Sequence, residues 1–257
     1  MHMSDALVSI PIAGLTTFLS VSILLVAIRK VKNDTQKLPL MGVMGAFIFA
    51  AQMINFTIPG TGASGHLMGG ILLAALLGPW AGFLTLSSVL IIQCLLFADG
   101  GVMALGCNIL NMAVCSCLIV YPLVFRPIAG QSMNTGRLFL ASIIACNIAL
   151  ILGATMVTLE TEASGVTSLP IDRFMLFMIP IHWVIGIGEG LATGAVLSFL
   201  ARFRPEVLQA SDVPSKVVRQ QLWMGIVLAI VLGVCGYYWA STLPDGLEWS
   251  IEKTIEG

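Results

Sequence analysis

SIPIAGLTTFLSVSILLVAI, residues 9–28, is an uncharged and mostly apolar stretch that runs directly into Arg29 and Lys30. An α-helix of about 20 such residues is long enough to cross the hydrocarbon core of a bilayer. A secretory signal peptide would carry its basic residues before the apolar stretch, and here they follow it. The stretch therefore predicts a first transmembrane helix, and we expect the amino terminus to remain as it is synthesised.

The composition extends this interpretation to the whole chain. Of its 257 residues, 58% are hydrophobic and only 10% are charged, and the mean hydropathy is +0.98, all far from the balance of a soluble domain. The sequence predicts an all-α integral membrane protein with about seven transmembrane segments and one further C-terminal helix. The expected segments are Ser9–Ile28, Leu38–Ile58, a short Leu67–Gly78, Pro79–Phe97, Val102–Val124, Leu138–Thr158, Phe174–Ala201 and Gln220–Ala240.

The basic residues predict the orientation, because Lys and Arg are retained on the cytoplasmic side of a membrane. The segment that follows the first span should be inside, which puts Met1 outside. With alternating spans, ten of the twelve basic residues fall inside: Arg29, Lys30, Lys32, Lys37, Arg126, Arg137, Arg202, Arg204, Lys216 and Arg219. Nine of the thirteen acidic residues fall outside: Asp5, Asp99, Glu160, Glu162, Asp172, Asp245, Glu248, Glu252 and Glu256. We therefore expect a multi-pass protein of the cell (inner) membrane with both termini extracytoplasmic.

The alternation of loops between the two sides of the membrane also predicts a turn at Gly78-Pro79. A single helix through residues 67–97 would move the basic loop 202–219 to the outside. A short segment at membrane depth usually lines a cavity, so we expect a cavity near His66. The expected organisation is a membrane domain over 1–201, a cytoplasmic linker over 202–219, and a helix with an acidic exterior tail over 220–257.

Met1 and His2 form a potential chelate at the exterior end of the chain. The terminal amine, the amide nitrogen of His2 and its imidazole can bind one ion together, and His66 in the glycine-rich loop Pro59–Gly70 is the candidate for a fourth nitrogen donor. Imidazole suits nickel, copper, zinc and cobalt. The alternatives are a solvated terminus and a flexible loop that carries a stray histidine.

Polar residues in and near the spans are candidates to orient such a site. Gln93 and Asn108 can brace the loop that holds the ion or can simply bond neighbouring helices. His182 shares a helix face with Glu189 and is a candidate orienting residue, a transient ligand or a structural histidine, and Ser64 is a further orienting candidate. The row Gly186, Gly190 and Gly194 permits either close helix packing or docking of a partner.

Three function classes remain open on the residues alone. The sequence contains no G-x-x-x-x-G-K-[ST], H-E-x-x-H or G-x-S-x-G motif. The first class is capture of a transition metal ion, in which nitrogen donors in a plane suit a d8 ion such as nickel. Capture should weaken in acid, because the amine must lose its proton. The alternatives are an intramembrane zinc hydrolase that uses His66 and His182, and a metal sensor or scaffold that does not transport.

The chain also resembles a known family, the CbiM/NikM family. The resemblance rests on Met1-His2, the run Gly60–Gly70, the segment Gln93–Asn108 and the segment His182–Gly190, and Pro244–Trp249 resembles the PDGLE segment of an accessory subunit. It implies the substrate-binding subunit of an energy-coupling factor transporter, with Ni2+ or Co2+ as the transported substrate and no organic cofactor. It also implies Met1, His2 and His66 as metal ligands.

The implied partners are a transmembrane coupling subunit, two cytoplasmic ATPases and the lipid bilayer, with no nucleic acid and no enzymatic activity in this chain. The sequence departs from the family pattern at Met3–Ala6, at Cys107 and in the loop Gly62–His66, and none of these departures removes a proposed ligand.

Overall fold

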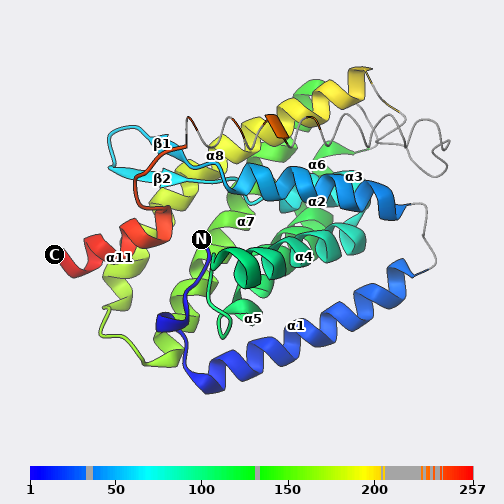
Figure 1. Cartoon of the computed structure of the whole chain (residues 1–257). Coiled ribbons are helices and arrows are strands. Elements are labelled where there is room, and N and C mark those ends of the chain that lie inside the picture. The colour runs from blue at the N-terminus through cyan, green and yellow to red at the C-terminus, as the bar shows by residue number, and fades with distance from the viewer. Residues whose placement is uncertain are drawn as a thin grey trace.

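The structure is a computed structural model that describes residues 1–32, 37–130, 134–203 and 240–256, with residues 205, 227, 230, 231, 234 and 238 besides. Most of the chain is helical (Figure 1). The elements are η1 (Asp5–Leu7), α1 (Ile10–Val31), α2 (Leu38–Gln52), β1 (Phe56–Ile58), β2 (Ala63–Gly65), α3 (Gly70–Leu77), α4 (Pro79–Phe97), α5 (Leu105–Asn108), η3 (Ile109–Phe125), α6 (Arg126–Ala129), α7 (Thr135–Ser164), α8 (Ile171–Phe203) and α11 (Gly246–Glu256).

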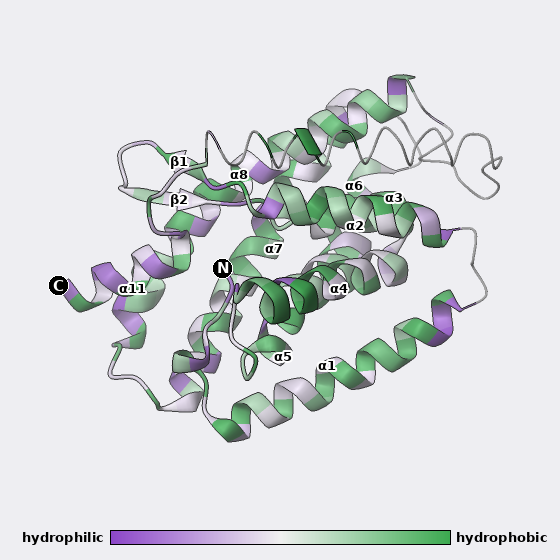
Figure 2. Ribbon diagram, in the orientation of Figure 1, coloured by the Kyte–Doolittle hydropathy of each residue, from purple (hydrophilic) through white to green (hydrophobic). Residues whose placement is uncertain are grey.

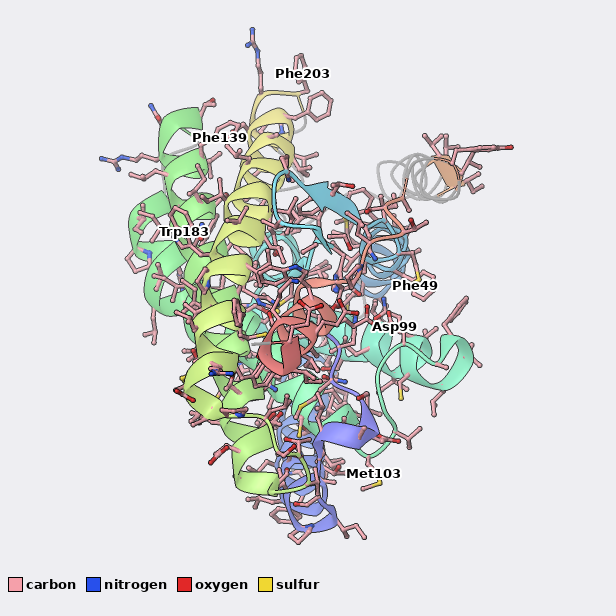
Figure 3. All side chains as sticks on the ribbon, turned by 90° about the vertical axis from the view of Figure 1, so that its left-hand side faces the viewer. Phe49, Asp99, Met103, Phe139, Trp183 and Phe203 are labelled. Atoms are coloured by element: carbon pink, nitrogen blue, oxygen red, sulfur yellow. The ribbon has the colours of Figure 1, made fainter. Side chains whose placement is uncertain are left out.

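Five helical stretches in the described ranges are long and apolar enough to cross a membrane: Ile10–Val31, Pro79–Phe97, Leu105–Ala129, Thr135–Ser164 and Ile171–Phe203. The third comprises α5, η3 and α6, and most of it has π-type hydrogen bonding. Helix α1 lies at the edge of the bundle and is apolar along its length (Figures 1 and 2). Large apolar side chains such as Phe18, Leu96 and Phe203 point outward, Phe203 from the end of α8 (Figure 3). Such a surface suits lipid, which confirms the predicted multi-pass membrane protein.

The predicted span Leu38–Ile58 is wrong at its end. Helix α2 stops at Gln52, and Phe56–Ile58 forms strand β1, which pairs antiparallel with β2. The connection between the strands turns at Gly60 and Gly62, both with positive φ, which glycine adopts at little steric cost. The apolar run thus leaves the helix and closes a hairpin whose second strand leads to His66. The predicted span Gln220–Ala240 and the linker 202–219 lie almost entirely outside the described residues.

The predicted turn at Gly78-Pro79 is present. Helix α3 ends at Leu77, Gly78 has a φ of +85° and Pro79 begins α4. A Cβ at Gly82 would lie 2.8 Å from the backbone nitrogen of Ala74, so the two helices are in direct backbone contact. Almost every residue of α3 is buried, as expected for a helix that is apolar on all sides.

The glycine row of α8 packs internally against α7. A Cβ at Gly186 would approach Asn147, one at Gly190 would lie 2.4 Å from the Cα atom of Ile143, and one at Gly194 would meet Phe139. In lipid, where burial of apolar surface does little to join helices, this close approach provides the packing energy. Of the two uses predicted for the row, the described residues show helix packing.

We expect Gly190→Ala to lower the melting temperature of the detergent-solubilised protein, because the new methyl group meets backbone that cannot yield. Overpacking of this kind costs about 1–3 kcal/mol. The matched control is Gly188→Ala on the same helix, where the nearest atom to the new methyl group is 3.5 Å away. A Gly190→Ala protein as stable as the control would contradict the packing described.

Candidate metal centre

The amino terminus is built into the bundle. Met1 and Met3 are buried, and the thioether of Met1 lies against Gly153 of α7. The backbone nitrogen of Met3 donates to Asn108 Oδ1 at 2.8 Å, and Asn108 Nδ2 donates back to the Met3 carbonyl at 3.1 Å. A solvated terminus is therefore the wrong alternative. Two roles were considered for Asn108, bracing the loop that holds the ion and bonding neighbouring helices. In the structure it holds this terminal segment instead.

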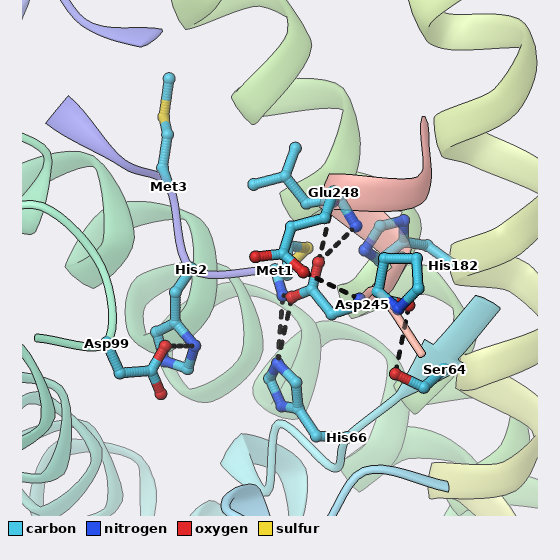
Figure 4. A network of polar contacts seen from close by, with 12 residues as sticks. Met1, His2, Met3, Ser64, His66, Asp99, His182, Asp245 and Glu248 are labelled. Carbon is cyan, nitrogen blue, oxygen red and sulfur yellow. Dashed lines mark hydrogen bonds and ion pairs between the residues drawn. The ribbon is translucent and has the colours of Figure 1, made fainter. Parts of the chain in front are cut away.

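The structure brings Met1, His2 and His66 together. The terminal amine lies 3.1 Å from His66 Nε2, and the rings of His2 and His66 stack with centroids 5.2 Å apart (Figure 4). The amine also donates to Asp245 Oδ2 at 2.8 Å. Three segments that are far apart in sequence thus meet at one nitrogen atom.

His66 presents a nitrogen lone pair to the amine. Its Nδ1 lies 3.2 Å from the carbonyl oxygen of Leu67, and because a carbonyl only accepts, we assign the ring proton to Nδ1. Burial, and then the charge of the amine, lowers the pKa of His66 to about 4. The ring is therefore neutral at physiological pH, the state in which imidazole binds metal.

His2 is paired with a carboxylate. Its Nδ1 lies 3.2 Å from Asp99 Oδ1. Burial, His66 and the amine together lower the pKa of His2 well below its ordinary value, while burial raises the pKa of Asp99. His2 is thus a neutral imidazole whose chelating nitrogen faces Asp99.

Two chains of hydrogen bonds fix the backbone that follows His66. Glu189 of α8 accepts from the backbone nitrogens of Met68 and Gly69 at 2.8 and 3.0 Å. Gln93 donates to Gln52, and Gln52 donates to the Met68 carbonyl. Gln93 therefore supports the loop through Gln52, and the loop is a fixed element rather than a flexible connector.

The role of Glu189 was not predicted. The sequence signal for it was an acidic residue inside a predicted span, which is costly there unless it has a specific partner. The left-handed backbone of Gly69 was found only in the structure.

Ser64 and His182 line the other side of the site. The Ser64 hydroxyl and backbone nitrogen bond the carbonyls of Leu243 and Pro244 in the tail. His182 Nδ1 lies 2.8 Å from the Met178 carbonyl, and its Nε2 is buried without a partner among the described residues. The predicted cavity beside His66 is present and is lined by Met1, Gly65, His66, Met68, Met112, Leu150, His182, Ile185 and Gly246.

Side chains alone do not make a metal site in the described part of the chain. Within it, no three His, Cys, Asp or Glu side chains are grouped so as to hold an ion. The hydrolase alternative would need such a group of ligands as well as an open position for water. An ion at this place would draw on the amine and amide nitrogens of the first two residues.

Comparison with known proteins finds similarity to proteins of metal transport. Residues 2–207 match the family model described as "Cobalt uptake substrate-specific transmembrane region". A protein of Archaeoglobus fulgidus named for fused nickel transport is 39% identical over 84% of this chain and 71% of its own length. The fused nickel transport protein of Rhodobacter capsulatus is 33% identical over 98% of this chain and 76% of its own.

A solved structure has a fold similar to that of this chain. The crystal structure of a truncated transition metal transporter superposes with a TM-score of 0.68 at 30% identity. The match covers 78% of this chain and 98% of that one.

The buried His66 makes the metal-free protein sensitive to acid. The unfolded chain binds a proton at this ring below a pH of about 6.5, whereas the folded ring binds one only near pH 4. Stability should therefore fall as the pH drops from 6.5 to 4, by about 1.4 kcal/mol per pH unit for one proton. Thermal unfolding at a series of pH values in the presence of a chelator measures this.

His66→Gln is the matched variant for this prediction. It keeps a polar side chain and removes the titrating group, so the slope between pH 6.5 and 4 should decrease by about one proton. An unchanged slope would mean that His66 is not buried as a neutral ring.

Proposed function

The chain belongs to the CbiM family of cobalt uptake transmembrane proteins, and from this we propose that it captures Ni2+ or Co2+ for import. It acts as the substrate-binding membrane subunit of an energy-coupling factor transporter. Relatives that are named for nickel or cobalt transport support the choice of substrates.

The distance of 3.1 Å between the terminal amine and His66 Nε2 carries the proposal. Two nitrogens that bind one transition metal ion at a right angle, with bonds of about 2.1 Å, lie about 3.0 Å apart. The two atoms therefore already have the separation of neighbouring ligands. The ion would take the place of the proton that they share.

His2 would complete the ligand set by a small movement. Its amide nitrogen is adjacent to the amine in the chain, and its Nδ1 lies 3.2 Å from Asp99 Oδ1. Rotation of the ring away from Asp99 would bring Nδ1 to the ion and close the second chelate ring. Four nitrogens in a plane, one of them a deprotonated amide, favour Ni2+ over Co2+.

The position of the site along α1 supports capture from outside the cell. Helix α1 is about 33 Å long at 1.5 Å per residue, and it separates the site from Arg29 and Lys30 at its other end. If the basic end is cytoplasmic, the site lies near the opposite surface of the membrane. Release to the inside would then depend on the coupling subunit and the two ATPases of such a transporter. The sequence itself has no phosphate-binding loop.

The binding experiment measures nickel in the full-length protein, purified through a C-terminal tag with its amino terminus verified by intact mass. We expect one ion per chain. His66→Ala and His2→Ala should each lower the affinity by about 100-fold or more, because each removes a nitrogen donor. One residue added before Met1 should do the same, because it moves the amine.

A protein with Asp172→Asn, which removes a charge from the first turn of α8, serves as the control and should bind as the wild type does. Undiminished binding after the one-residue extension, or after His66→Ala, would contradict the proposed site.

Transport is tested separately. Proteoliposomes that contain this chain together with the coupling subunit and both ATPases should accumulate nickel only with ATP, and those with His2→Ala should not. Binding without uptake in the complete assembly would instead indicate a sensor or scaffold.

A further inference from the structure

Asp245 lies at the centre of the site although it comes from the far end of the chain. Its two carboxylate oxygens have different partners. Oδ1 accepts from the backbone nitrogens of Leu247 and Glu248, both at 2.9 Å, and so caps the start of α11. Oδ2 lies 2.8 Å from the terminal amine and 3.9 Å from His66 Nε2. One oxygen is therefore structural, and the other faces the two nitrogens proposed as ligands.

The surrounding contacts fix Asp245 in this place. On one side, Ser64 holds the carbonyls of Leu243 and Pro244. On the other, the ring of Trp249 packs edge-on against Phe177 of α8 with centroids 5.8 Å apart. The backbone at Gly246 passes so close to His182 and Ile185 that an added Cβ would lie 3.0–3.2 Å from them. The carboxylate is thus held in a fixed position at the site and does not belong to a loose tail.

The amine, His66 Nε2 and Asp245 Oδ2 are arranged as three donors around one point. From their three separations, a point in their plane lies about 2 Å from each atom, which is the bond length of a divalent transition metal to nitrogen or carboxylate oxygen. Around that point His66 and Asp245 stand nearly opposite each other, with the amine between them.

We propose that Asp245 supplies an early and temporary oxygen ligand to the incoming ion. It binds the ion together with the amine and His66, and it later gives way to the amide nitrogen of His2. In a plane of four nitrogens the amide stands beside the amine and opposite His66, which is the position that Asp245 Oδ2 holds before the ion is fully bound. The amine and the amide each release one proton to solvent as their bonds to the metal form.

This inference rests on the proposed function and assigns the tail a role in loading. A carboxylate can bind a cation without first losing a proton, whereas the amide must give up its proton first. The oxygen therefore provides a fast first bond at a place where the final nitrogen donor is slow to form.

The test is the rate of Ni2+ association with the full-length protein, followed by stopped-flow absorbance of the nickel complex. Asp245→Asn keeps the helix cap, because asparagine is an equally good N-cap residue, and removes the charged oxygen. We expect it to associate about tenfold more slowly or worse, with a final absorption spectrum and nickel content equal to those of the wild type. Glu252→Gln removes a charge from the exposed face of α11 and should associate at the wild-type rate.

Three results would overturn the inference and leave the proposed function intact. They are a wild-type rate for Asp245→Asn, an equal slowing by Glu252→Gln, and a final Asp245→Asn spectrum that differs from the wild type, which would mean that the carboxylate stays on the ion. Failure of the wild type to bind nickel, or unchanged binding after His66→Ala, would instead overturn the proposed function.

Discussion

The buried terminal amine, held between His66 and Asp245, is the interaction on which the rest of the structure depends. A cation in a protein interior is costly unless it is paired and hydrogen-bonded, and here it has both a carboxylate and an imidazole. Burial alone would raise the pKa of Asp245, but the amine and His66 hold it well below its usual range, so the carboxylate stays charged. The first residue, the segment that follows strand β2 and the tail are thereby joined at a single atom, and the surrounding helices hold each of the three in place.

The glycine-rich loop shows how a flexible sequence becomes a fixed ligand support. Its glycines allow the left-handed turns at residues 60, 62 and 69, and its position is then set from outside by Glu189, Gln52 and the tail. Supports of this kind orient a ligand without binding the metal themselves. The stiffness of the loop therefore comes from α2, α8 and the tail, and its own composition supplies only the freedom to adopt the required shape.

Hydropathy predicted the long helices, because a helix that crosses lipid must be apolar over about 20 residues. The turn at Gly78-Pro79 was predicted from the alternation of loops between the two sides of the membrane. The end of α2 was not, because Phe56–Ile58 is as apolar as the helix before it, and its pairing with residues 63–65 is a tertiary contact. Donor chemistry singled out Met1, His2 and His66 as candidate ligands, and the structure brings the three together. Asp245 was taken as one of several acidic residues of an exterior tail, since nothing in the sequence distinguishes a charge that reaches residue 1 from one that faces water.

The covalent continuity between the tail and the body has a consequence for assembly. A carboxylate supplied by a separate polypeptide would reach the site only as often as that polypeptide is bound, so its occupancy would depend on the relative expression of two genes. When the same group belongs to the same chain, its effective concentration is set by geometry and is independent of dilution. Each copy of this protein therefore carries its own Asp245 in a fixed one-to-one ratio.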